Sequence, residues 1–360
     1  MNNYVFNDNE RKLFALPPKL GGLGIIIPSQ LSSFQYANSR KITKSLVDNV
    51  KNQVEAISID AVEVKKFKLE VKNTKRRNEE LILESLKQQM SPLKLKLLEA
   101  TTETGASSWL SAIPLKDHDF YLNKQSFWDT LYLRYGIDLP RLPSRCVCDS
   151  KFDVEHALNS KKGGFVTIRH NDVRDFTANM LTEVCKDVCT EPSLVPLTGE
   201  TFNKKTTITD DEARVDVSAR GFWTRGNKAF FDVRVFNPLA KSYSKQNLKS
   251  THRSQEQEKK RKYSERILNV EHGSFTPLVF TCFGGMGIEA QRFYKRLAEM
   301  LAEKRSIEMS STVNWIRTKL SFILVKTALL CVRGSRSVRS SFEPISTTDI
   351  PVAVFEANVR

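Results

Sequence analysis

The stretch ARVDVSARGFWTRGNKAFFDVRVF, residues 213–236, decides the fold that we predict for this chain. It contains two β-like runs, 213–217 and 229–236, joined by the turn-rich GFWTRGNK. Each run carries one aspartate, Asp216 or Asp232, among apolar residues. Burying a carboxylate in such surroundings is unfavourable unless a cation or hydrogen-bond donors accompany it. The two runs therefore predict neighbouring strands with paired carboxylates.

Paired carboxylates on neighbouring strands suit Mg²⁺ or Mn²⁺ chemistry. Mg²⁺ binds one or two carboxylates together with water and phosphate oxygens, so Asp216 and Asp232 are the predicted ligands. A second interpretation places both aspartates on exposed strand faces, where Arg214 and Arg234 would pair with them. The residues that follow favour the metal site.

A strongly basic helical stretch, SQEQEKKRKYSER at 254–266, follows the second strand. Lys259 and Tyr263 are four residues apart and therefore share a helix face. A lysine beside a bound metal can orient the attacking water and stabilise charge on a scissile phosphate. A solvated surface helix would have a similar sequence, and Lys260 and Lys262 are alternatives to Lys259.

Elsewhere the chain alternates between segments with a helical sequence pattern and segments with a β-like one. Apolar residues recur at helical spacing over 31–98, and a short helical connector follows up to Pro143. After that point β-like runs alternate with helices, which predicts an α/β (α+β) fold with a restriction-endonuclease-like core and a mostly helical amino-terminal region. The predicted segments are a structured loop (1–30), a helical region (31–145), a Cys/His knuckle (146–164), the core (165–310) and a helix with a basic tail (311–360).

The composition indicates a polyanionic partner. Lys and Arg number 56 against 41 Asp and Glu, which leaves a net charge of +15. Such an excess favours a polyanion through counterion release, and a ribosome-like partner, a membrane surface or DNA would each satisfy it. The amino terminus lacks the apolar run of a signal peptide, and the apolar run 320–332 is interrupted by Lys326 and too short to cross a bilayer. We expect a nuclear or cytoplasmic protein that is not secreted and has no membrane partner.

Cys146, Cys148 and His156 have the spacing of a small metal knuckle. They supply three of the four ligands that a structural Zn²⁺ needs, and the fourth expected position is occupied by Ser160. An ordinary pair of thiols is the alternative interpretation. Either a further ligand that folding brings near completes the site, or the knuckle no longer binds zinc well.

The run Arg169-His170-Asn171 precedes a helix predicted over 172–188. Within this helix Glu183 can face the metal as a third acid. His170 has two other interpretations: it is a structural histidine, or it completes the zinc site, a role for which Cys185 is also a candidate.

Taken in order, these residues resemble the restriction-like endonuclease of site-specific non-LTR retrotransposons, whose reading frame ends in a reverse transcriptase, a Cys/His knuckle and this nuclease. The residues that match are Cys146-Val147-Cys148, His156, Arg169-His170-Asn171, Asp216, Asp232, Lys259 and Tyr263. The resemblance implies a PD-(D/E)XK nuclease with Asp216, Asp232 and Lys259 as its catalytic residues and Tyr263 as an accessory residue. LPPKLGGLGI at 16–25 is similar to the segment that follows the polymerase domain in such elements.

Three positions depart from the family pattern. Val215 stands where the first acidic motif usually has proline, and Ser160 stands where the knuckle has its last ligand. Arg234 replaces the lysine that many nucleases of this superfamily carry on the second strand. Because arginine keeps its proton, it can hold a phosphate but activates water poorly.

The resemblance implies a Mg²⁺-dependent endonuclease that nicks DNA for target-primed retrotransposition. Its partners would be DNA, the element RNA and a reverse transcriptase domain in cis or in trans, since the chain has no polymerase Asp-Asp motif of its own. Two alternatives are a catalytically decayed nucleic-acid-binding relic and a structural role for the helices at 31–98. The expected DNA-binding residues are Arg169, His170, Arg234, Lys260, Arg261 and Lys262, together with the basic stretches 251–266 and 333–339.

Overall fold

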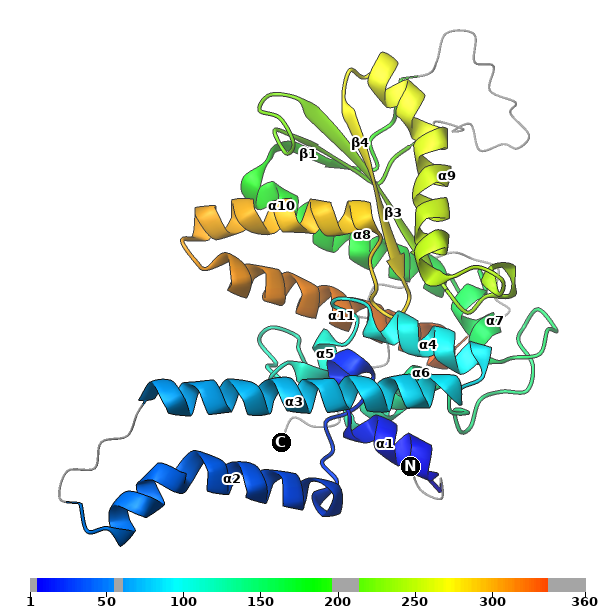
Figure 1. The fold of residues 1–360 in the computed structure, drawn as a ribbon. Coiled ribbons are helices and arrows are strands. Elements are labelled where there is room, and N and C mark those ends of the chain that lie inside the picture. Colours follow the sequence, from blue (N-terminus) through cyan, green and yellow to red (C-terminus); the bar gives the residue numbers. More distant parts are fainter. Residues whose placement is uncertain (1–4, 55–60, 196–213, 336–360) are drawn as a thin grey trace. The chain divides into compact units, whose positions relative to one another are not determined.

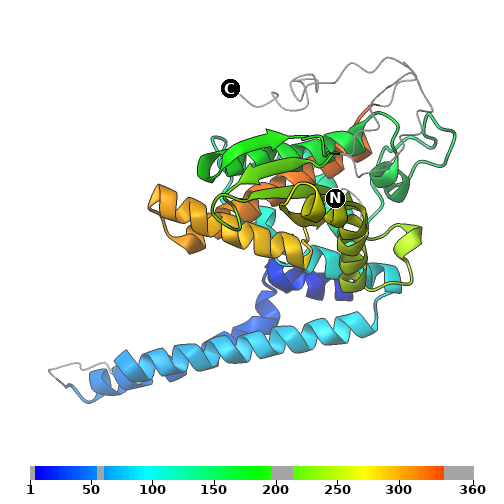
Figure 2. The same ribbon diagram turned by 90° about the horizontal axis from the view of Figure 1, so that it is seen from above.

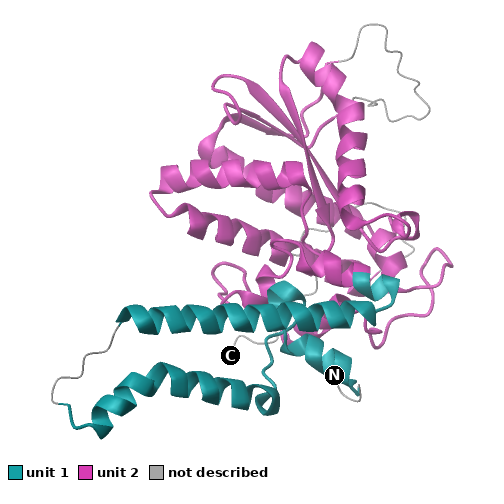
Figure 3. Cartoon of the chain, viewed as in Figure 1, with its two compact units in different colours: residues 1–95 teal, residues 96–360 magenta. Residues whose placement is uncertain are grey.

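The computed structural model describes residues 5–54, 61–195 and 214–335. The chain divides into two compact units, residues 1–95 and residues 96–360 (Figure 3). The helical region expected over 31–145 is thus shared between the units. The part of the basic tail beyond residue 335 lies outside the described residues.

The first unit is helical. It contains α1 (Asp8–Ala15), a 3-10 turn (Pro18–Leu20), α2 (Pro28–Lys51) and α3 (Ala61–Gln88). The expected loop is present around Gly21 and Gly24, which have positive φ, but α1 precedes it. The long helices α2 and α3 lie side by side in opposite directions (Figure 1), and Lys41 of α2 pairs with Glu70 of α3 at 3.5 Å.

The second unit surrounds a small sheet with helices. The sheet has the order β1-β2-β3-β4, with β3 paired antiparallel to β2 and parallel to β4. Its elements are α5 (Ser108–Ser111), α6 (Lys124–Tyr135), α7 (Val154–Asn159), α8 (Phe165–Val184), β1 (Lys186–Thr190), β2 (Val217–Arg220), β3 (Lys228–Phe236), a 3-10 turn (Lys241–Tyr243), α9 (Leu248–Asn269), β4 (Ser274–Thr281), α10 (Ile288–Arg305) and α11 (Met309–Arg333); α4 (Pro92–Thr102) leads into this unit.

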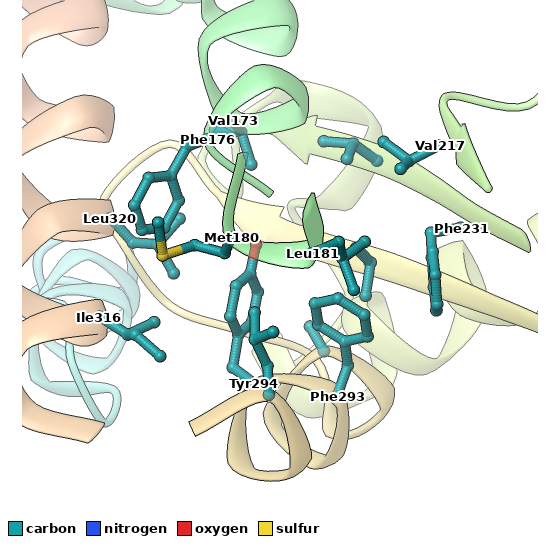
Figure 4. Close-up of a cluster of buried hydrophobic side chains, with 14 of the residues drawn as sticks. Val173, Phe176, Met180, Leu181, Val217, Phe231, Phe293, Tyr294, Ile316 and Leu320 are labelled. Carbon is teal, nitrogen blue, oxygen red and sulfur yellow. The ribbon is translucent and has the colours of Figure 1, made fainter. Parts of the chain in front are cut away.

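The two faces of the sheet are covered by different helices (Figures 1 and 2). α8 and α10 pack on one face, with α11 behind them, and α9 runs along the other. Because side chains alternate across a strand, β3 contributes to both cores. Phe231 enters the main apolar cluster with Leu181 and Phe293 (Figure 4), whereas Phe230 packs with Ile267 of α9.

The register leaves part of β3 without a neighbour on one side. β2 begins at Val217, which is opposite Phe231. Among the residues that the structure describes, the following residues of β3, through Phe236, pair with β4 alone. A strand edge therefore opens directly beside Asp232.

The structure confirms a mixed α/β architecture and revises several boundaries. The strand expected at 229–236 and the basic helix are present, but the first acidic run is strand only from Val217 onward. The helix expected at 172–188 is α8, which already begins at Phe165, so Arg169-His170-Asn171 lies inside it rather than before it. None of the described helices combines the length and apolarity needed to span a membrane.

Candidate functional site

Asp232 lies in the middle of β3 and points toward α9. The residue is 3% exposed, which excludes the interpretation that it sits on a solvated strand face. Lys259 of α9 places its Nζ 2.6 Å from Asp232 Oδ2. Arg234, two residues further along the same face, pairs instead with Glu258 at 3.4 Å. The cation that approaches Asp232 is therefore the predicted helix lysine.

Asp216 immediately precedes β2, whose first residue, Val217, pairs with Phe231 of β3. Its backbone N–H donates to the carbonyl of Phe231 at 3.1 Å. Its carboxylate accepts the backbone N–H of Val233 at 2.5 Å. The Asp216 side chain thus takes the place of a strand partner for β3 and is held at the strand edge, where it is half-buried.

His170 of α8 is the second donor to Asp216. Its Nε2 lies 3.1 Å from Asp216 Oδ2 and 3.1 Å from the carbonyl oxygen of Val233. Both atoms accept hydrogen bonds, so Nε2 carries a proton and donates. Burial, the largest influence, lowers the pKa of His170, but the hydrogen bond and charge of Asp216 outweigh it and the pKa is raised. His170 is therefore a hydrogen-bond partner of Asp216, whereas the sequence predicts it as a DNA contact.

The two aspartates influence each other electrostatically. Burial is the main cause that raises the pKa of Asp232; Lys259 opposes this effect and the charge of Asp216 adds to it. Burial and the charge of Asp232 also raise the pKa of Tyr263 to about 12. Tyr263 is 4% exposed and its ring packs against Phe275. It therefore remains a neutral phenol beneath the acidic pair, as suits an accessory residue.

The contact between Lys259 and Asp232 is close but poorly directed. Within the part of the chain that the structure describes, Asp232 Oδ2 is buried and has no hydrogen bond of normal geometry, even though Lys259 Nζ is 2.6 Å away. We interpret the contact as an ion pair without a well-oriented N–H. Such an oxygen retains lone pairs for another ligand.

A cavity of about 740 Å³ opens beside this cluster. Its floor is the unpaired edge of β3, and its walls are α7, the start of α8 and the loop that follows β3. The cationic side chains that line it are Lys161, Arg169, Arg234, Lys241 and Lys259, with His170 at the side of the acidic pair. The sequence patterns did not identify Lys161 and Lys241 as site residues. The only features that could have pointed to them are the glycine pair close to Lys161 and the turn at Lys241.

Glu183 is not part of this cluster. It lies near the carboxyl end of α8, thirteen positions beyond His170, or roughly 20 Å along the helix axis. Its carboxylate pairs there with Arg305 at 2.6 Å. The expectation that Glu183 supplies a third acid is wrong for this structure, because Glu183 pairs with Arg305 and it is His170, in the first half of α8, that reaches the aspartates.

The expected DNA contacts are only partly suited to that role. Arg169 is 2% exposed and donates to the carbonyl of Leu158, so it supports the walls of the cavity rather than offering a free cation. Lys260 pairs with Glu289 at 2.6 Å. Arg261 and Lys262 are exposed on α9 but do not line the cavity. Arg234 and His170 do line it.

Cys146, Cys148 and His156 converge as predicted. Their ligand atoms lie within 4.8 Å of one another, and Cys148 Sγ is 3.4 Å from His156 Nε2. Asp153 caps α7 by accepting the N–H of His156, which sets the orientation of that helix. Over residues 5–54, 61–195 and 214–335 this is the one group of three or more His, Cys, Asp or Glu ligand atoms this close together.

Neither proposed additional ligand completes this cluster. His170 is bound to Asp216, and Cys185 packs against the main apolar core. Ser160, the residue at the expected fourth position, accepts the N–H of Lys162. Hydrogen bonds from Ser150 lower the pKa of Cys148, which favours the thiolate that a metal would bind.

Comparison with known proteins adds no relative. No family model matches the chain, and no curated protein matches its sequence significantly. The chemistry of the site therefore has to be argued from its geometry.

Proposed function

We propose that this protein is a metal-dependent DNA endonuclease with a restriction-endonuclease-like core. The observation that carries the proposal is the convergence of Asp216, Asp232 and Lys259, which come from the residue before β2, from β3 and from α9. Two carboxylates and an ammonium beside a cationic cavity form the arrangement needed to hold a divalent ion and a phosphodiester. The net charge of +15 favours a nucleic acid as substrate.

The two carboxylates fit a hard cation. Asp232 Oδ2 is buried without a well-directed hydrogen bond, and the charge of Asp216 is near enough to raise the pKa of Asp232. Asp216 and Asp232 would hold Mg²⁺ or Mn²⁺, which prefers such oxygen ligands. When bound, the ion supplies positive charge to the reacting phosphate and makes a water ligand more acidic.

The remaining side chains act on the phosphate and on the acids. Lys259 holds an ammonium at the mouth of the cavity, where it can donate to a water or to a nonbridging phosphate oxygen and stabilise developing negative charge. His170 fixes the carboxylate of Asp216 by donating to it. Tyr263 remains protonated and supports Asp232 and Lys259 from below.

The likeness to retrotransposon nucleases extends the proposal to a biological setting. In that setting the nick primes reverse transcription by a polymerase in cis or in trans, and the element RNA is a further partner. The Cys146, Cys148 and His156 cluster would bind a structural Zn²⁺. These extensions rest on the order of the matching residues in the sequence.

The test is nicking of supercoiled plasmid by the purified full chain with Mg²⁺. Asp232→Asn keeps the size of the side chain but removes its charge, and we expect it to abolish nicking. Glu299→Gln is the matched control, because Glu299 is a carboxylate of α10 that pairs with Arg296 at 3.4 Å, outside the cluster. Equal nicking by wild type and Asp232→Asn would contradict the proposal.

A decayed nucleic-acid-binding protein is the second candidate. The ion pair between Lys259 and Asp232 favours it, because the ammonium occupies the space around an oxygen that a metal would need. This candidate predicts binding of DNA without nicking under any divalent metal. The plasmid assay, run beside a binding assay, separates the two functions.

A further inference from the structure

The cavity of about 740 Å³ beside Lys259 is also lined by residues that have no role in the proposed catalytic cluster. We infer that it binds one or two nucleotides of a single nucleic-acid strand next to the phosphate that is cut. The inference rests on the proposed function, because it states that the nucleic-acid substrate of the proposed nuclease is single-stranded at this site. It can still be tested by binding alone.

The charge of the lining points to a phosphate chain. Lys161 and Lys241 are exposed in the lining of the cavity, and within the described part of the chain no carboxylate lies within ion-pair distance of either ammonium. Glu155 is the one acid among the lining residues, and its Oε1 already accepts the backbone N–H of Lys241 at 3.0 Å. The cavity therefore presents positive charge that no neighbouring carboxylate compensates.

The floor of the cavity offers backbone hydrogen-bonding groups. In β3, Val233 directs its N–H to Asp216 and its carbonyl to His170, both on the side that faces away from β4. Val235 is two residues further on and directs its backbone groups to the same side. Among the described residues no hydrogen bond reaches Val235 there, since β2 does not extend so far. Unpaired backbone groups of this kind favour a ligand with polar edges.

One wall of the cavity is aromatic. Tyr243 lines the cavity, is partly exposed, and has its ring 5.6 Å from that of Phe236 in an edge-on arrangement. The buried Phe236 holds the Tyr243 ring in place and leaves ring surface available. An aromatic ring next to two lysines is the combination on which single-stranded nucleic acids stack their bases.

The size of the cavity suits a short piece of a single strand. A volume of about 740 Å³ is within the range of small-molecule sites, roughly 300–1,000 Å³. The proposed ligand is therefore one or two unpaired nucleotides.

The experiment measures binding by the full chain in the Asp232→Asn background, so that no cleavage intervenes. Fluorescence anisotropy is recorded with a labelled 12-nucleotide DNA, the matching RNA, and the blunt DNA duplex, across a series of salt concentrations. The variants are Lys161→Ala/Lys241→Ala and Tyr243→Ala. Lys295→Ala is the matched control, an exposed lysine on α10 that does not line the cavity.

We expect the double lysine variant to weaken binding of the single-stranded DNA at least tenfold. Its salt dependence should fall by about 1.4 in log–log slope, which is the release of counterions from two phosphates. Tyr243→Ala should weaken binding about tenfold, in the range for loss of one stacked base, while Tyr243→Phe and Lys295→Ala should bind as the parent does. The RNA arm tells whether the site distinguishes the two sugars.

Two results would overturn the inference. One is an unchanged affinity in the double lysine variant and Tyr243→Ala, with their melting temperatures retained. The other is an equal loss of affinity for duplex and for single strand. That result would show that the two lysines attract any nucleic acid through their charge alone. If wild type nicks plasmid while either result is obtained, the proposed function stands and the inference fails. If wild type binds the single strand through these residues without nicking, the inference stands and the nuclease proposal fails.

Discussion

Lys259 Nζ lies 2.6 Å from Asp232 Oδ2 and joins α9 to the middle of β3. The side chain of Asp232 is 4% exposed and that of Lys259 is 16% exposed. An ion pair so far from solvent has lost much of the hydration of both ions, so each partner depends on the other. This ion pair therefore contributes both to the stability of the folded core and to the proposed catalytic site.

The first prediction concerns the stability of this pair. Lys259→Met leaves the carboxylate of Asp232 buried without its cation, and we expect the free energy of unfolding to fall by about 3 kcal/mol. The double variant Asp232→Asn/Lys259→Met should recover most of this loss, because neither charge then remains. Urea denaturation of the four proteins of the double-mutant cycle measures the coupling.

Lys262→Met is the matched control for this cycle. Lys262 is exposed on the same helix, with its ammonium over the ring of Tyr263. We expect it to change the free energy of unfolding by no more than about 0.5 kcal/mol. Additive effects of the Asp232 and Lys259 substitutions would show that the two side chains are not coupled.

The second prediction separates Glu183 from the acidic pair. Because Glu183 pairs with Arg305 on the surface, at 2.6 Å, Glu183→Gln should leave the nicking rate unchanged. It should lower the free energy of unfolding by no more than about 1 kcal/mol, the usual range for an exposed ion pair. Parallel nicking assays and denaturation curves test both points. Loss of nicking in a stably folded Glu183→Gln protein would restore Glu183 as a catalytic acid.

The third prediction is a pH dependence due to Asp172 of α8. Burial, aided by the charge of Asp175, raises the pKa of Asp172 from 3.8 to about 6. Between these values the folded protein binds more protons than the unfolded chain, so the free energy of unfolding falls as the pH rises through this window. Above this pH window, the buried charged carboxylate lowers the free energy of unfolding by a constant amount.

Asp172→Asn removes this disadvantage. We expect a gain of about 1 kcal/mol at pH 7.5 and little change at pH 4, after allowing for solvent screening of a partly exposed group. Urea denaturation of both proteins at the two pH values measures the difference. A gain of the same size at both values would rule out the titration of Asp172 as its cause.

The fourth prediction concerns the metal knuckle. The full chain should bind one Zn²⁺, and replacement by Co²⁺ should give the absorption of thiolate ligands. Cys148→Ser should lose this absorption, because it removes one of the three converging ligands. Cys189→Ser, which changes an exposed thiol of β1, is the control. Identical metal content in Cys148→Ser and wild type would refute the site.

Removal of the metal should also loosen the segment around α7. Metal binding to a small loop contributes to its folding, because the site does not preexist in the unfolded chain. Hydrogen exchange of residues 144–160 should therefore accelerate after treatment with a chelator, while α10 remains protected. Unchanged exchange in this segment would mean that the cluster does not depend on a metal.

Part of the site could be predicted from local patterns. Asp232 was identified because a carboxylate interrupts an apolar strand, and that strand is β3. Lys259 and Tyr263 were identified from their four-residue spacing on a basic helix, and α9 directs both toward β3. These successes share a cause: the period of a strand or a helix is a local property, and it determines which side chains face inward.

Other parts depended on where α8 begins. A glycine pair at Gly163 and Gly164, both with positive φ, allows the helix to start at Phe165. His170, in the first half of this helix, bonds to Asp216, whereas Glu183 near the carboxyl end pairs with Arg305. The sequence pattern placed the helix start at residue 172 and so left His170 outside the helix; helix boundaries are the least reliable feature of a sequence pattern.

The sequence by itself determined the basic charge, the helical amino-terminal region, the acidic strand and the lysine helix, because composition and periodicity act over a few residues. Only the tertiary structure decided that Asp216 bonds to β3 beside Asp232, that His170 holds it, and that Lys161 and Lys241 line the cavity at an open strand edge. The physical reason is that these relationships join segments far apart in the chain. They arise from strand register and from the crossover through α9, which no short window of sequence contains.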